Sequence, residues 1–205
     1  MSLSVFVNSG LHGADWPRET HAVATNVFGT ERRIDVKNGL GEHCEEALIR
    51  ELWRVIEDRE GRRAAGSNLP PLRKSLKMFI SYSPCYDCSI RLIDFIKHAD
   101  IALEIAFSAL CNIHRPSCIR LCRHRLCEKF ESQQNIKGLK ALILEGVNIH
   151  PFTDDDWREL VAALGFSTAV AADAISRRAE MIEDNRMQSD FEELFGKERK
   201  SLFRL

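Results

Sequence analysis

The stretch LKMFISYSPCYDCSIRLIDFIKHADIALEIAFSAL, residues 76–110, predicts a strand, a helix and a second strand in succession. Leu76 to Tyr82 is short, apolar and rich in residues that favour strands. Ser83 and Pro84 supply an N-cap and a first-turn proline, so we expect the helix to begin there. Ile101 to Leu110 is almost wholly apolar, as expected of a central strand covered by helices on both faces.

Three patterns precede this unit. His21 to Phe28 alternates apolar and polar residues and Arg32 to Val36 can return beside it, which predicts a β-hairpin. After Gly41, apolar residues recur at three- and four-residue steps, which predicts an amphipathic helix that ends in the charged run Glu57 to Arg63. The stretch GRRAAGSNLPPLRK, residues 61–74, contains Gly, Ser, Asn and a Pro pair, so we expect an exposed loop.

Downstream, Gly138 to Glu145 favours a helix and Val147 to Phe152 favours a strand. Thr153, followed by three aspartates, is a good helix start, and the chain from Trp157 onward is mostly helical in character. Helices thus alternate with strands after an initial hairpin. This order predicts an α/β layer architecture with extra helices at the C-terminal end.

Composition sets broad limits on function. The chain has 205 residues, 44% of them hydrophobic, and a formal net charge of -1, so its total charge gives no sign of nucleic-acid binding. Its seven cysteines are an odd number, which favours thiol or metal chemistry over a secreted disulfide framework. No apolar stretch is long enough to span a bilayer. We therefore expect a cytoplasmic or nuclear protein with no membrane partner.

Two short motifs share the chemistry of one metal. His43-x-Glu45 and Pro84-Cys85-x-x-Cys88 together form H-x-E and P-C-x-x-C, the signature of zinc-dependent deaminases. One imidazole and two thiolates make three protein ligands, which in catalytic zinc sites leaves a fourth position for water. Cys85 and Cys88 are three residues apart, so both lie on one face of a helix, and a helix N-terminus favours thiolates.

Glu45 fits a different role from the three ligands. A carboxylate that is not bound to the metal can take a proton from water and deliver it to a base and to departing ammonia. A structural zinc site with a fourth protein ligand, or no metal, is the alternative. Because H-x-E supplies only one soft ligand, the motif favours a catalytic site with Zn2+.

The segment SYSPCYDC, residues 81–88, resembles the SWSPC-x-x-C segment of the AID/APOBEC polynucleotide cytidine deaminases. The similarity extends to Arg18-Glu19-Thr20, to Asn38, and to GLKALILEGVNIHPFTDDDW at residues 138–157. It implies a cytidine deaminase-like three-layer fold, with a five-stranded mixed sheet flanked by about six helices and parallel fourth and fifth strands. We expect a single domain over residues 1–205, with its core at about 18–164 and a helical extension at about 165–205.

The same resemblance implies a set of substrate contacts. The Thr20 loop would touch the target nucleotide, and Asn38 its sugar. The Cys44 amide would meet the base O2, the Ser83 carbonyl would meet its exocyclic amine, and Tyr82 would form one wall of the pocket.

Two departures from the family pattern stand out. Tyr82 replaces the usual Trp, and Cys111-Asn112-Ile113-His114-Arg115 lacks the usual aromatic pair. The candidate substrate-binding residues are Arg18, Thr20, Asn38, Cys44, Tyr82, Ser83, His114 and Arg115.

Residues 111–127, CNIHRPSCIRLCRHRLC, leave three interpretations open. The arginines, Arg115 among them, would follow a phosphate backbone while His114 stacks on a base. A second Zn2+ would be held by Cys111, His114, Cys118 and Cys122, or by a set including His124 and Cys127. Alternatively, the cysteines pack in a core on a helix that exposes its arginines.

Three functions follow for this set of motifs. The first is conversion of cytosine to uracil in single-stranded DNA, with RNA also open as the substrate. The second is a free cytidine or deoxycytidylate deaminase, and the third is a nucleic-acid-binding relative without chemistry. We expect a monomer or a weak homo-oligomer. Antiviral innate immunity, antigen-receptor diversification and transcript editing all stay open as roles.

Overall fold

The computed structural model describes residues 3–9, 19–29, 32–39, 41–67, 75–113, 115–117, 129–180 and 183–202. Within them, five strands form one mixed sheet in the order β2-β1-β3-β4-β5. The strands are β1 (His21–Thr25), β2 (Ile34–Lys37), β3 (Ser75–Tyr82), β4 (Ala102–Ala109) and β5 (Asn148–Pro151). The helices of the described residues are η1 (Val27–Gly29), α1 (Leu3–Asn8), α2 (Cys44–Ala64), α3 (Tyr86–Ala99), α5 (Lys129–Leu144), α6 (Asp154–Ala163), α7 (Thr168–Glu180) and α8 (Glu183–Leu202).

The sheet joins a hairpin to a parallel unit. β1 pairs antiparallel with β2 and with β3, whereas β3, β4 and β5 run parallel to one another. α3 connects β3 to β4, and α5 leads back to β5. The α/β class, the five-stranded mixed sheet, and the parallel fourth and fifth strands are thus confirmed, in a cytidine deaminase-like layout.

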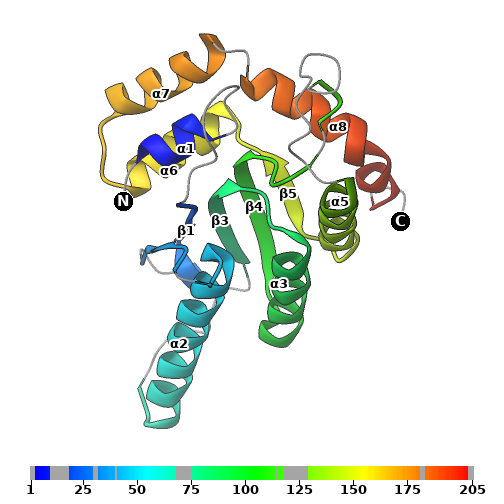
Figure 1. Cartoon of the computed structure of the whole chain (residues 1–205). Helices are drawn as coiled ribbons and strands as arrows, with labels where there is room; N and C mark the ends of the chain where they lie inside the picture. The colour runs from blue at the N-terminus through cyan, green and yellow to red at the C-terminus, as the bar shows by residue number, and fades with distance from the viewer. Residues whose placement is uncertain are drawn as a thin grey trace.

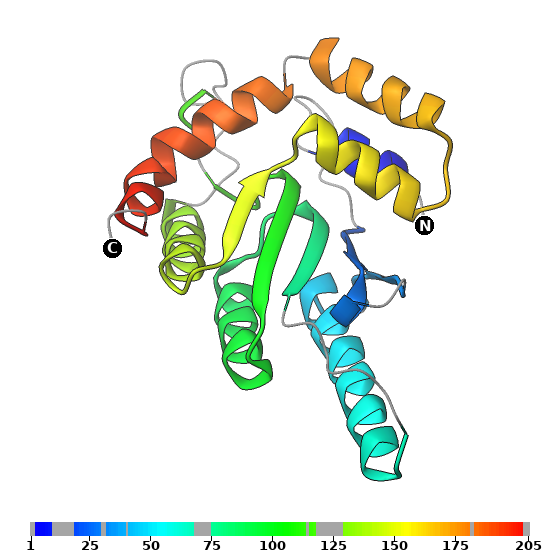
Figure 2. The same ribbon diagram turned by 180° about the vertical axis from the view of Figure 1, so that it is seen from behind.

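Helices cover both faces of the sheet (Figures 1 and 2). α2, α3 and α5 pack on one face, where Leu48, Leu92 and Leu139 are fully buried. α1, α6 and α7 lie on the other face, where Trp157 of α6 and Phe79 of β3 belong to one buried cluster. The two apolar layers make a three-layer α/β/α core. Among the described residues, no helix combines the length and the apolar character needed to cross a membrane.

The carboxyl end of β3 leads directly into the α3 start, which carries two cysteines. Ser83 still donates its N–H to Ala109 O at 2.7 Å, so the sheet pairing continues one residue past the strand. α3 therefore begins at Tyr86 with Cys85 as its N-cap. Our prediction of Ser83 as N-cap and Pro84 as a first-turn residue was wrong, because Ser83 is held by the neighbouring strand.

Two other helix boundaries differ from the sequence-based expectation. α2 continues through Ala64, so the loop expected over residues 61–74 begins later. An ion pair between Asp58 and Arg62 supports this last turn, and Gly66, at φ +87°, follows the helix end. α5 begins at Lys129, nine residues before the expected Gly138. Elsewhere the expected hairpin is present, and Thr153 is the N-cap of α6, with its hydroxyl accepting the Asp156 N–H.

Candidate metal centre

Three ligand-bearing residues come together where two helices begin. His43 is the N-cap of α2, Cys85 is the N-cap of α3, and Cys88 lies in the first turn of α3. In open sheets, ligands bind beyond the carboxyl ends of parallel strands, and β3 ends at Tyr82, just before this turn. The predicted metal ligands are therefore adjacent although His43 and Cys85 are 42 residues apart in sequence.

The donor atoms have the separations that a tetrahedral ion requires. His43 Nδ1 lies 3.5 Å from Cys85 Sγ and 3.2 Å from Cys88 Sγ. An ion bonded at about 2.0 Å to nitrogen and about 2.3 Å to sulfur sets these donor atoms about 3.5 Å apart. Within the described part of the chain, no other His, Cys, Asp or Glu joins this group. The three residues could thus hold a metal ion and leave a coordination position free of described side chains.

A carboxylate ties the two halves of the centre together. Glu46 Oε2 accepts the backbone N–H of His43 at 2.9 Å, which fixes the N-cap of α2. Its other oxygen pairs with Arg91 of α3 at 2.9 Å. The helix that carries His43 is therefore held against the helix that carries both cysteines.

The two thiols share their protons unequally. A hydrogen bond from the Cys88 side chain lowers the pKa of Cys85 to about 6, aided by the Cys88 backbone N–H and the nearby His43. Donating that same hydrogen bond, together with burial, raises the pKa of Cys88. Cys85 is therefore the thiol of the pair that loses its proton first, which favours binding of a cation.

Glu45 lies beside the three ligands without joining them. It occupies the first turn of α2, is only 5% exposed, and does not belong to the metal-binding group. Burial raises the pKa of its carboxyl group above the ordinary value. The Cys44 thiol, whose own pKa is raised by burial, donates to Glu45 Oε2 at 3.3 Å. A carboxyl group in this setting holds a proton more readily than an exposed one, as a proton-transfer role requires.

Two predicted substrate residues lie together next to Cys44. Thr20 donates its N–H to Asn38 Oδ1 at 2.8 Å, and Asn38 N–H returns a bond to Thr20 O at 3.0 Å. The Thr20 side chain is also hydrogen-bonded to the Cys44 thiol. The structure thus gathers Thr20, Asn38 and Cys44 around the start of α2, and their contacts with substrate stay predictions.

Tyr82 and Ser83 form the other side of the α3 start. Tyr82 is 7% exposed and pairs with Ala109 across the two parallel strands. The buried Ser83 hydroxyl accepts the Cys111 N–H at 2.9 Å. These two predicted substrate residues therefore join the cysteine-bearing helix to the segment that follows β4.

Arg115 does not lie on an open basic surface. Its guanidinium is buried, donating to Asp190 at 2.7 Å and to Glu183, both in α8. Asp190 also accepts from the N–H and hydroxyl of Ser117. The expectation that Arg115 tracks a phosphate backbone was wrong, because two carboxylates of the C-terminal helix neutralise it. A signal for this pairing existed in the acidic positions of residues 183–190, but nothing in the sequence showed which arginine they face.

Several predicted residues lie outside the part of the chain that the structure describes. They are Arg18, His114, Cys118, Cys122, His124 and Cys127. The second zinc site therefore rests on Cys111 alone among described positions, and Cys111 belongs to no metal-binding group there. That site stays a prediction.

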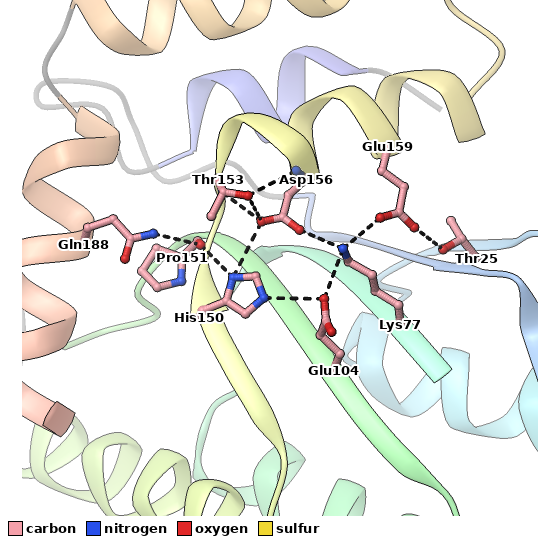
Figure 3. A network of polar contacts seen from close by, with 9 residues as sticks. All are labelled: Thr25, Lys77, Glu104, His150, Pro151, Thr153, Asp156, Glu159 and Gln188. Atoms are coloured by element: carbon pink, nitrogen blue, oxygen red, sulfur yellow. Dashed lines mark hydrogen bonds and ion pairs between the residues drawn. The ribbon is translucent and has the colours of Figure 1, made fainter. Parts of the chain in front are cut away.

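A second group of potential metal ligands, Glu104, His150 and Asp156, lies on the other face of the sheet (Figure 3). Lys77 Nζ already fills the space between the carboxylates, 3.1 Å from Glu104, 2.9 Å from Asp156 and 2.8 Å from Glu159. The three carboxylates raise the pKa of Lys77 even though burial opposes them. This ammonium supplies the positive charge of the cluster, which joins α6 to β3, β4 and β5.

Asn135 of α5 was not singled out from the sequence, yet it contacts the metal centre's surroundings. Its Oδ1 accepts the Tyr86 N–H at 2.9 Å and its Nδ2 donates to Cys111 O at 3.0 Å. Asn135 ends the run Gln133-Gln134-Asn135, so the sequence does not show which of the three amides is buried. Nor does the sequence show the partners of Asn135.

No known protein-family model matches the chain, and no curated protein matches it significantly.

Proposed function

We propose that the protein is a zinc-dependent deaminase that converts cytosine to uracil in single-stranded polynucleotides, with DNA as the first substrate to test. The observation that carries this proposal is the pairing of an incomplete His/Cys/Cys ligand set with a buried glutamate that is not a ligand. A structural zinc site would need four protein ligands and no such glutamate. Imidazole with two thiolates is a donor set that suits zinc.

The chemistry divides between metal and protein. A bound Zn2+ supplies a Lewis acid that makes water a nucleophile at neutral pH. The Glu45 carboxylate would take one proton from the attacking water and deliver it to N3 of the ring as the water oxygen bonds to C4. The same carboxylate would then carry the proton of the new C4 hydroxyl to the C4 amine, so that the C–N bond breaks, ammonia leaves and the C4 carbonyl of uracil forms. Its raised pKa suits Glu45 to both directions of transfer.

The substrate assignment rests on the residues beside Glu45. Thr20, Asn38 and Cys44 lie on one side of the α2 start, and Tyr82 and Ser83 lie on the α3 side. A cytosine edge needs hydrogen-bond partners and an aromatic wall, and these residues would supply both. The preference for a polymer over a free nucleoside rests on the resemblance to polynucleotide deaminases, since Arg115 is paired with carboxylates.

The test is uracil formation by the zinc-loaded full-length protein at low salt. The substrates are a single-stranded DNA oligonucleotide of mixed context, single-stranded RNA, duplex DNA and free cytidine, with metal-stripped protein as the control. Activity on single-stranded DNA that is lost with the metal supports the proposal. Activity on free cytidine alone overturns the polymer assignment, and inactivity on all four substrates with zinc bound overturns the enzyme assignment in favour of a binding protein.

A further inference from the structure

α5 approaches the first turn of α3 unusually closely at Gly138. A Cβ atom added at this position would lie 2.9 Å from the Tyr86 Cα and 2.9 Å from Ser89 Oγ. One of these neighbours is backbone, so the contact could be relieved only by moving a helix. The absence of a side chain at Gly138 therefore sets the distance between α5 and the helix that carries Cys85 and Cys88.

Asn135 lies one turn before Gly138, and the close approach of the two helices brings its side chain within hydrogen-bonding distance of α3. The two residues are three apart, so they share one face of α5. The Asn135 side chain is 6% exposed, and both ends of its amide are occupied. Its oxygen accepts from Tyr86 N at 2.9 Å, and its nitrogen donates to Cys111 O at 3.0 Å.

The Tyr86 N–H is the first backbone donor of α3, and a helix leaves the donors of its first turn without an intrahelical acceptor. Asn135 supplies from another helix an acceptor for this first donor. The backbone N–H of Cys88, two residues further along, donates to Cys85 Sγ. A contact from α5 therefore helps to hold the helical turn that carries both sulfur atoms.

The second bond of Asn135 reaches the segment after β4. The Cys111 carbonyl accepts a hydrogen bond from Asn135 Nδ2, and the Cys111 N–H donates to the Ser83 hydroxyl at 2.9 Å. The two backbone groups of Cys111 are thereby held, one by α5 and the other by the residue that precedes Pro84 and Cys85. One buried amide connects the cysteine half of the metal centre with the chain that borders it.

We propose that Asn135, brought to the start of α3 by Gly138, is a positioning residue for the Cys85/Cys88 half of the metal centre. This inference rests on the proposed function for the identity of the metal. Side chains that orient ligands from outside the coordination sphere typically change metal affinity 10- to 100-fold when removed. A loss of that size is the expected effect of removing the Asn135 amide.

The experiment is a Co2+ titration of the metal-free full-length protein, followed by thiolate-to-cobalt charge-transfer absorption. Asn135→Ala is expected to bind Co2+ about 10- to 100-fold more weakly than the unsubstituted chain. Gln133→Ala is the matched control: it removes an exposed amide from the same helix and should bind within about twofold. Asn135→Asp keeps an acceptor for the Tyr86 N–H and should lose less affinity than Asn135→Ala.

Thermal unfolding of the metal-free variants separates positioning from general stability. If Asn135→Ala lowers the melting temperature but binds Co2+ within about twofold of the unsubstituted chain, Asn135 is a packing residue and the proposal fails. If Asn135→Ala does not fold, Asn135→Asp decides in the same way, with affinity equal to the unsubstituted chain as the contrary result. Because the readout is metal binding, a chain that binds Co2+ normally but forms no uracil refutes the proposed function and leaves the role of Asn135 intact.

Discussion

Replacing Arg178 by Met removes a guanidinium that joins four parts of the chain. Arg178 is 0% exposed and donates to Val7 O at 3.2 Å, Ser9 O at 2.7 Å and Ser108 O at 3.0 Å. Its remaining contact is an ion pair with Asp184 at 2.7 Å. These bonds link α1, β4 and α8 to α7, on the face of the sheet that α1, α6 and α7 cover.

Met fills much of the same volume but donates no hydrogen bond, so the carbonyl groups lose their partners. Each buried acceptor left unsatisfied costs about 1–3 kcal/mol before the structure relaxes. Asp184 is 24% exposed and also accepts from Trp157 Nε1, so its loss is partly compensated. We expect Arg178→Met to lower the free energy of unfolding by about 3–5 kcal/mol, the usual cost of breaking a buried ion pair.

The neighbouring Arg177 provides the matched control. Its side chain is 65% exposed and pairs with Asp173 across one helical turn, a contact worth about 0.3–0.5 kcal/mol. In urea unfolding followed by circular dichroism, Arg178→Met should shift the midpoint strongly and Arg177→Met hardly at all, with similar slopes. Equal shifts for the two variants, or a loss below about 1 kcal/mol for Arg178→Met, would show that the buried Arg178 guanidinium does not stabilise the fold.

Three further outcomes are expected. Cys85→Ser should lose bound zinc and fall in melting temperature, as metal analysis and calorimetry will show, because metal-binding energy at such a site is also folding energy. In metal-free protein, the rate of Cys85 alkylation by iodoacetamide should rise with pH around a midpoint of about 6, because the reactive thiolate forms above that pKa. Mass spectrometry maps the alkylated residue. A midpoint near 9, the ordinary thiol pKa, would contradict this expectation. Gly138→Ala should lower the melting temperature, because the new Cβ would meet the Tyr86 backbone. Gly61→Ala is the control: its Cβ would have no atom within 4 Å, so the higher helix propensity of Ala, up to about 1 kcal/mol, should raise the melting temperature.

The grouping of His43, Cys85 and Cys88 could be predicted because it depends largely on residues that are close in sequence. Cys85 and Cys88 are three residues apart, and His43 and Glu45 are two apart, so covalent spacing alone places each pair at one helix start. The strand before Cys85 is apolar and β-prone over most of its length, so the position of the cysteines just after a strand could be predicted as well. Only the distance between the two pairs had to come from the fold.

The contacts that surround the centre depend on long-range packing. Arg115 meets carboxylates 68 and 75 residues away, and Asn135 meets an N–H 49 residues away. A run of arginines near a loop is typical of a solvated surface, so the sequence pointed to phosphate where the structure has buried ion pairs. The α3 start illustrates the same limit: Ser83 is a strong N-cap by propensity, yet pairing with β4 takes priority.

The most direct test of the account is a single-turnover measurement of uracil formation by zinc-loaded protein, comparing the unsubstituted chain with Glu45→Gln and determining zinc content in the same samples. Glu57→Gln, an exposed carboxylate change in the same helix, is the control. Glu45→Gln should form uracil at least about 100-fold more slowly with its zinc content unchanged, because general acid–base catalysis contributes about 10²- to 10⁴-fold. Unchanged activity in Glu45→Gln, or loss of zinc from it, would show that Glu45 is not a proton carrier separate from the metal ligands.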